Sequence, residues 1–97
     1  MYAIILRYKV PLAAIEAQVD AHRQWLKAQY AAGKFLLSGP QQPRVGGFIL
    51  AAAMERAALD DIVKGDPFHA NGLADYEIIG ISPTGASDRL SFLIEQP

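Results

Sequence analysis

The sequence predicts a single α+β domain in which one antiparallel sheet carries two helices on one face. Four short segments are rich in β-branched and aromatic residues, which favour strands. Two longer segments with apolar residues at helical spacing separate the first strand from the second and the third from the fourth. The length of 97 residues fits one domain, spanning residues 1–97, and excludes two domains.

The first strand and the first helix occupy the N-terminal third of the chain. Residues 2–8 form a short apolar segment that stops before Pro11, and proline suits the first turn of a helix. The helix that follows is expected to end at Gly33. Its predicted core-facing stripe recurs every three or four residues and consists of Leu12, Ile15, Val19, His22, Leu26 and Tyr30.

The middle of the chain predicts two strands joined by a wide loop, and then a helix. The strands cover residues 35–37 and 47–53, and the residues 38–43 between them are rich in turn-forming types. The second helix covers residues 55–64 and ends at Gly65. Its predicted inward side chains are Ala58, Leu59, Ile62 and Val63.

The last third of the chain begins with a capped turn. Asp66 suits the N-cap of this turn and Pro67 its first position. Residues 73–81 form the fourth strand, which Pro83 ends. The tail, residues 83–97, contains the apolar run 90–94, which we expect to add a strand to an edge of its own sheet or of a partner's sheet.

The resulting order β-α-β-β-α-β is the ferredoxin-like arrangement. Two helices cover only one face of such a sheet, yet the strands are apolar on both faces, as the run from Ala3 to Leu6 illustrates. A face exposed to water would carry a polar residue at every second position. We therefore expect a homodimer in which the uncovered face packs on a second copy of the chain.

Composition excludes several classes of function. Nine basic and ten acidic residues give a net charge of −1 without any basic cluster, so nucleic acid is not an expected partner. The absence of cysteine excludes disulfides, thiolate metal sites and a cysteine nucleophile. The opening apolar run is too short for a membrane span and lacks the features of a signal peptide, so we expect a cytoplasmic protein with no membrane partner.

Several short motifs follow one another in a distinctive order along residues 1–81. They are His22 and Trp25, the segment 33–40 ending in Ser38-Gly39-Pro40, Gly46-Gly47, Asp66-Pro67-Phe68 with Gly72, and Tyr76-Glu77. In this order and spacing they resemble the YCII (YciI-like) family. The resemblance implies a dimeric α+β barrel with a His/Asp pair in a cleft and, for a few members, activity on lactone-type or chlorinated aromatic breakdown products. Residues 84–97 lie outside the resemblance.

His22 and Asp66 are the candidate catalytic residues. Histidine titrates near neutral pH, and a carboxylate beside it would fix its tautomer and raise its basicity. Both residues also have a structural interpretation. A histidine in an apolar stripe is often a hydrogen-bonded core residue, and Asp followed by Pro is a helix-capping pattern. The two roles of Asp66 are compatible, because one carboxylate oxygen can accept a backbone N–H while the other orients His22.

Five residues are candidates for contact with a substrate: Ser38, Gly39, Pro40, Phe68 and Tyr76. Ser38 lacks the strand-to-helix turn of serine nucleophiles, so we expect it to contact a substrate oxygen rather than to attack it. Gly39 permits close backbone approach, Phe68 suits a pocket wall, and Tyr76 could point into a cleft.

Two hypotheses for function remain open. The first is a cofactor-free enzyme in which His22, oriented by Asp66, performs general acid-base chemistry on a small carbonyl- or lactone-like metabolite, by isomerisation, elimination or hydrolysis. The alternative is a non-catalytic dimeric protein that binds a small molecule in the same cleft. The only other histidine, His69, is not at a metal-ligand spacing from His22, so neither a metal nor a cofactor is expected. An open pocket beside the pair favours the first hypothesis, and a sealed pair favours a structural role.

Overall fold

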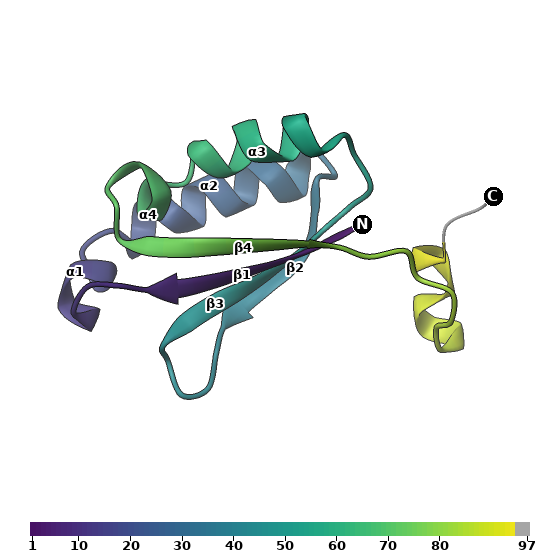
Figure 1. Cartoon of the computed structure of the whole chain (residues 1–97), viewed down its shortest axis with the longest axis horizontal. Helices are drawn as coiled ribbons and strands as arrows, with labels where there is room; N and C mark the ends of the chain where they lie inside the picture. The colour runs from purple at the N-terminus through teal and green to yellow at the C-terminus, as the bar shows by residue number, and fades with distance from the viewer. Residues whose placement is uncertain (95–97) are drawn as a thin grey trace.

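Four strands form one antiparallel sheet in the order β2-β3-β1-β4 (Figure 1). In the computed structural model, which describes residues 1–94, the strands are β1 (Tyr2–Tyr8), β2 (Phe35–Pro40), β3 (Gly46–Ala51) and β4 (Ala74–Gly80). The first strand pairs with β3 on one side and with β4 on the other. This topology, with helical segments after the first and third strands, confirms the predicted ferredoxin-like α+β fold.

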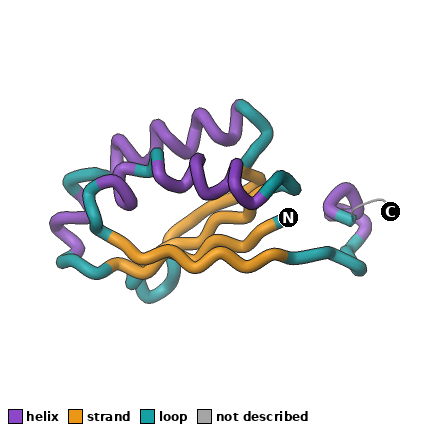
Figure 2. Tube along the Cα trace, turned by 45° about the horizontal axis from the view of Figure 1, so that its top comes forward, coloured by secondary structure: helices purple, strands orange, loops and turns teal. Residues whose placement is uncertain are grey.

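The long helices lie together on one face of the sheet (Figure 2). The helices of the domain are α1 (Leu12–Glu16), α2 (Val19–Ala31), α3 (Arg56–Lys64) and the short α4 (Pro67–Ala70). α4 contacts α2, α3 and β4, so it joins the helical layer to the sheet. Within residues 1–94, every helix is too short or too polar to cross a membrane.

The long first helix predicted from periodicity is divided in two. α1 ends at Glu16, and a turn at Ala17 and Gln18 precedes α2. The Gln18 amide donates to the Ile15 carbonyl at 3.0 Å, a turn tighter than that of an α-helix, which changes the direction of the chain. Pro11 precedes α1 as its N-cap, with an extended backbone, so its predicted place in the first turn is wrong by one position.

Both predicted core-facing stripes are only partly correct. In the first stripe Ile15 is buried, whereas Leu12 and Tyr30 at its two ends are exposed. Because the helix is divided, α1 is turned relative to α2. A single straight stripe of side chains therefore cannot face the core along both helices. In α3, Leu59 and Val63 are buried and Ile62 packs against the core, while Ala58 is exposed because it lies at the margin of the apolar face.

The strand β2 continues through residues that the sequence assigned to a turn. Ser38 pairs with Ile49, and Gly39 pairs with Phe48, so β2 extends to Pro40. Pro40 is tolerated there because β2 is an edge strand, where a residue without an N–H group breaks no central ladder. The turn is therefore confined to residues 41–45, and β3 ends at Ala51, before residues 52–53.

The core lies between the sheet and the helices. Both the sheet and the helical layer contribute to it, through β1 and β3 on one side and α1, α3 and α4 on the other. The fully buried apolar side chains are Ile4, Leu6, Ile15, Ile49, Leu59 and Phe68. At about 25 cal/mol per Å² of apolar surface removed from water, each such side chain stabilises the fold by about 1.5–3 kcal/mol. The helical layer is thus held firmly over one face.

The other face of the sheet carries no helix in this chain (Figure 2). Its apolar residues alternate with the core residues along the strands and pair across them, Ile5 with Phe48 and Leu50 with Leu37. We call this surface the helix-free face, defined by Ala3, Ile5, Leu37, Phe48, Leu50 and Ile79. Leu37 is 51% exposed and Ile79 is 41% exposed, so this face is apolar and uncovered in the single chain.

The tail does not form the predicted extra strand within its own chain. It leaves the end of β4 as an extended segment and forms a 3-10 helix, η1 (Asp88–Leu93), which stands away from the sheet (Figure 1). Phe92 is 71% exposed and Leu90 is exposed as well. Within residues 1–94, the apolar run 90–94 pairs with no strand of the sheet. Residues 95–97 of the predicted tail lie outside the described residues.

Candidate functional site

Asp66 lies at the junction of α3 and α4, where the sequence dictates a helix start. Its side chain caps α4 by accepting a hydrogen bond from the Phe68 amide at 3.0 Å, and Pro67 occupies the first turn. The predicted capped turn is therefore confirmed. Asp66 is 0% exposed, so its carboxylate has been removed from water and depends entirely on protein donors.

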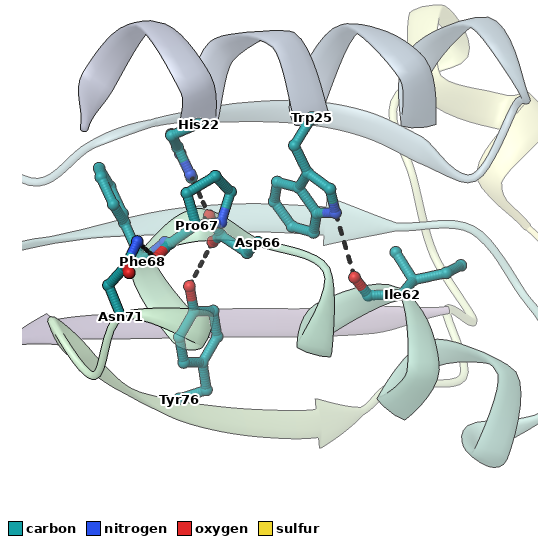
Figure 3. Close-up of polar contacts among 8 residues, drawn as sticks. All are labelled: His22, Trp25, Ile62, Asp66, Pro67, Phe68, Asn71 and Tyr76. Carbon is teal, nitrogen blue, oxygen red and sulfur yellow. Dashed lines mark hydrogen bonds and ion pairs between the residues drawn. The ribbon is translucent and has the colours of Figure 1, made fainter.

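The structure brings His22 and Asp66 together from different helices. His22 projects from α2, and its Nδ1 atom lies 2.7 Å from Oδ1 of Asp66 (Figure 3). A carboxylate oxygen only accepts, so Nδ1 carries the proton and Nε2 is the unprotonated nitrogen of the neutral ring. Within residues 1–94, Nε2 has no hydrogen-bond partner.

Tyr76 holds the other side of the same carboxylate. Its hydroxyl, on β4, donates a hydrogen bond to Oδ2 of Asp66 (Figure 3). Burial, reinforced by the neighbouring Asp66 carboxylate, raises the pKa of Tyr76 well above its usual range, so the hydroxyl stays a donor. Tyr76 does not line the cavity beside His22, so the prediction that it contacts substrate is replaced by a role behind the carboxylate. Sequence alone missed this role because Tyr76 and Asp66 meet only through the packing of β4 on α4.

Aromatic rings fix the plane of the His22 side chain. The Phe68 ring stacks on it with centroids 4.0 Å apart and planes 5° apart. The Trp25 ring lies 5.6 Å from the histidine ring, and its Nε1 donates to the Ile62 carbonyl at 3.1 Å (Figure 3). The imidazole is therefore restrained both by the hydrogen bond at Nδ1 and by packing on its face.

A cavity of about 440 Å³ opens beside the histidine. We call it the His22 cavity. Part of its wall is apolar, from side chains on β1, β3 and α2: Leu6, Val19, Leu26 and Ile49. The predicted substrate-contacting residues Ser38, Gly39, Pro40 and Phe68 line it as well. His22, with a side chain 14% exposed, lines the cavity, whereas Asp66 lies behind it. The pair is open on the histidine side and sealed on the carboxylate side.

Ser38 has a partner other than the histidine. Its hydroxyl shares a hydrogen bond with the Tyr30 hydroxyl, which comes from the last turn of α2. Among residues 1–94 no hydrogen bond joins Ser38 to His22, so the arrangement is not that of a serine nucleophile with its base. Ser38 keeps a hydroxyl at the cavity wall where a substrate oxygen could be bound.

Two arginines at the cavity were missed by sequence reasoning. Arg23 follows His22 on α2, and Arg44 lies in the turn between β2 and β3. Arg44 Nη1 lies 3.0 Å from Oε1 of Glu16 at the end of α1. The adjacency of Arg23 to His22 was the available signal, whereas nothing local in the sequence marks Arg44.

Tyr8 also lines the cavity, where its ring packs edge-on against Phe68, whereas the second histidine lies elsewhere. His69 is exposed on α4 and lies edge-on to the Tyr76 ring, outside the His22 cavity. Within the part of the chain that the structure describes, His, Asp and Glu side chains form no group of three that could hold a metal ion. The chemistry available at the cavity is proton transfer by a restrained imidazole, with hydroxyl and guanidinium groups around it.

One solved structure has a fold similar to that of this chain. The protein is the 5-chloro-2-hydroxyhydroquinone dehydrochlorinase TftG from Burkholderia phenoliruptrix AC1100, in complex with 2,5-dihydroxybenzoquinone. The superposition has a TM-score of 0.70 at 22% sequence identity and covers 84% of this chain and 93% of that one. At this identity the likeness shows a shared fold.

Sequence comparison assigns the family. No curated protein sequence matches the chain. The sequence profile of the YCII-related domain matches residues 1–82, which include every strand, the four α-helices and all residues of the His22 cavity. The chain therefore belongs to the YCII family, as its motifs predict.

Proposed function

We propose that this chain is a cofactor-free enzyme in which His22 transfers a proton to or from a small carbonyl- or lactone-like metabolite. The observation that carries the proposal is the 2.7 Å contact between His22 Nδ1 and the buried Asp66 carboxylate, on a ring that lines an open cavity. A histidine used only for packing needs no open volume beside it.

Asp66 has the role of a positioning residue in this proposal. Its carboxylate accepts a hydrogen bond from Nδ1–H and so keeps Nε2 free to act as a base. When Nε2 takes a proton, the ring becomes positively charged, and the adjacent carboxylate stabilises that charge. Tyr76 and the Phe68 amide hold the carboxylate still while this happens.

Proton abstraction beside a carbonyl is the reaction that needs only these groups. Nε2 removes a proton from carbon, and the C–H electron pair becomes part of an enolate whose oxygen the Ser38 hydroxyl can bind. The enolate then expels a leaving group from the neighbouring carbon, which is elimination, or regains a proton at another carbon, which is isomerisation. Hydrolysis, in which Nε2 takes a proton from an attacking water, is the other reaction open to the site. The name of TftG, a dehydrochlorinase, supports elimination.

A second candidate is a non-catalytic protein that binds a small molecule in the same cavity. The observation in its favour is the complete burial of Asp66, whose three donors are also what a structural carboxylate requires. In that case the pair orients a ligand or supports the fold.

The two candidates are separated by two substitutions at the pair. A thermal-shift screen with lactones, muconate-like acids and small anions first supplies compounds that bind, and their turnover is then followed by absorbance. His22→Gln and Asp66→Asn should each reduce turnover by roughly 10²–10⁴-fold, because a positioned proton-transfer group contributes that much to rate. Binding of the same compound should change far less.

The matched control is His69→Gln, since His69 is exposed and lies outside the cavity. It should leave turnover unchanged. If His22→Gln lowers the melting temperature strongly but leaves turnover of a converted compound intact, the enzyme proposal is wrong. If no compound that binds is converted, the binding protein is the better conclusion.

We also propose that the chain is a homodimer. The helix-free face supports this, because Leu37 and Ile79 on it are exposed and Ile5, Phe48 and Leu50 are only partly buried within the chain. The largest apolar patch on a soluble monomer is often functional, and here the second copy supplies the same surface.

A further inference from the structure

The charge of the His22 cavity is unexplained by proton transfer alone. Two guanidinium groups, of Arg23 and Arg44, line it, and no carboxylate within residues 1–94 does. Asp66 lies behind the histidine ring, where three hydrogen bonds stabilise its carboxylate, and it does not line the cavity. The charged groups on the cavity wall are therefore the two guanidinium groups, and they share that wall with apolar side chains.

Arg23 has its whole set of donors available. Within residues 1–94 its guanidinium makes no ion pair and no hydrogen bond, although Asp20 lies one turn earlier on the same helix. It follows His22 on α2 and lines the same cavity. An arginine of this kind can bind a planar anion with two parallel hydrogen bonds.

Arg44 is oriented but not neutralised. Its one partner is Glu16, bound through Nη1, and both side chains are exposed to solvent. Exposed ion pairs of this kind contribute little to the free energy of unfolding. An arginine also has further N–H groups beyond the one that is engaged. Arg44 lines the cavity from the loop 41–45, and Glu16 engages one of its N–H groups and leaves the others for a ligand.

The apolar part of the cavity wall selects the rest of the ligand. Leu6, Val19, Leu26 and Ile49 offer no polar side-chain atom, and the volume of about 440 Å³ lies in the lower part of the range for small-molecule sites. A ligand that fills this space needs an apolar body. Its charged end must lie at the arginines.

We propose that the His22 cavity binds a small organic acid, with its carboxylate held by Arg23 and Arg44 and its apolar body against the leucine, valine and isoleucine side chains. This inference names the substrate class of the proposed enzyme and rests on the same cavity. The arginines are specificity-determining residues, and His22 faces the reacting part of the acid.

The test uses the single tryptophan of the chain as its reporter. Trp25 lies 5.6 Å from the His22 ring, so binding in the cavity should change its fluorescence. The probes are pairs of small aliphatic and aromatic carboxylates with their methyl esters, together with inorganic phosphate. Acids should bind in preference to their esters, and their affinity should fall as salt is added.

Substitution of the two arginines gives the decisive result. Arg23→Gln and Arg44→Gln should each weaken acid binding by about tenfold, as expected for loss of a charge-assisted hydrogen bond. Ester binding should not change. Lys27→Gln is the matched control, because Lys27 is a cation on the same helix that does not line the cavity. It should leave acid binding unaltered.

Three outcomes would overturn the inference: esters that bind as well as acids, acid binding that survives both arginine substitutions, or phosphate binding without acid binding. The failure of the proposed enzyme is a separate result. If only the enzyme proposal is wrong, acids bind in an arginine-dependent manner but are not converted. With a converted acid, the arginine substitutions should raise KM at nearly constant kcat, whereas His22→Gln lowers kcat.

Discussion

The two faces of the sheet contain similar side chains but differ in what covers them. Ile49 and Leu50 are neighbours on β3, yet Ile49 is almost fully buried under the helices and Leu50 is only half-buried on the helix-free face. Strand alternation places them on opposite sides. Helices from the same chain complete one face, and the other face remains uncovered. The difference shows that packing within the chain stabilises one face of this sheet far more than the other.

The site belongs to the covered face, and the reason is physical. Asp66 can remain buried because α2, α4 and β4 each bring a donor to it. The helix-free face has no comparable polar group in its centre, and its charged residues Arg7, Asp75 and Glu77 lie on exposed parts of the strands. Changes on the covered face should therefore affect folding and chemistry, and changes on the other face should affect association.

The largest expected difference is between Ile49→Ala and Leu50→Ala. Ile49→Ala should lower the free energy of unfolding by about 2–5 kcal/mol, because it leaves a cavity in a packed core. Leu50→Ala should cost less than half as much, with an effect that depends on protein concentration. Urea denaturation at two protein concentrations measures both. Equal, concentration-independent losses would contradict the comparison.

A change of similar size is expected at the buried carboxylate. Asp66→Ala removes the acceptor for the His22 ring, the Tyr76 hydroxyl and the Phe68 amide, and it also removes the cap of α4. Stranded buried donors and a lost cap together should cost about 3 kcal/mol of unfolding free energy. The control is Asp61→Ala on α3, because Asp61 is exposed and joined only to Lys64 at 3.9 Å. A loss below about 1 kcal/mol for Asp66→Ala would show that the network contributes little.

The helix-free face is tested by Leu37→Glu. Leu37 is half-exposed in the single chain, so the substitution should leave the fold intact but weaken the proposed dimer by at least about tenfold through burial of a charge. Sedimentation of the unaltered chain at micromolar concentration should give twice the mass of one chain. The mass of the variant should shift toward that of a single chain. Leu12→Glu, an exposed site on α1, is the control. A monomeric parent chain would contradict the comparison directly.

The smallest expected effect concerns the tail. Deletion after Pro83 removes η1, which stands away from the sheet (Figure 1), so monomer unfolding should change by less than about 0.5 kcal/mol. If Phe92 and Leu90 pack on a second copy, the deletion should weaken the dimer or increase binding of an apolar dye. Unchanged association and dye binding would show that the tail has no place in the interface.

The order of the elements and the capped turn at Asp66 both follow from the amino-acid sequence alone. Alternating apolar strands predicted both faces of the sheet, and Asp66 followed by Pro67 predicted the capped turn, because these features depend on near neighbours along the chain. The YCII motifs correctly indicated the family and nominated His22, Asp66, Ser38 and Phe68, which the fold brings to one place.

How the site residues contact one another depends on the packing of the folded chain. The place of Tyr76 behind Asp66 and the presence of both Arg23 and Arg44 at one cavity depend on contacts between segments far apart in sequence. Spacing along one element cannot reveal them, because a cavity is defined by surfaces from several elements. The periodicity of a helix shows which side is apolar, and packing alone decides which side chains border an open volume.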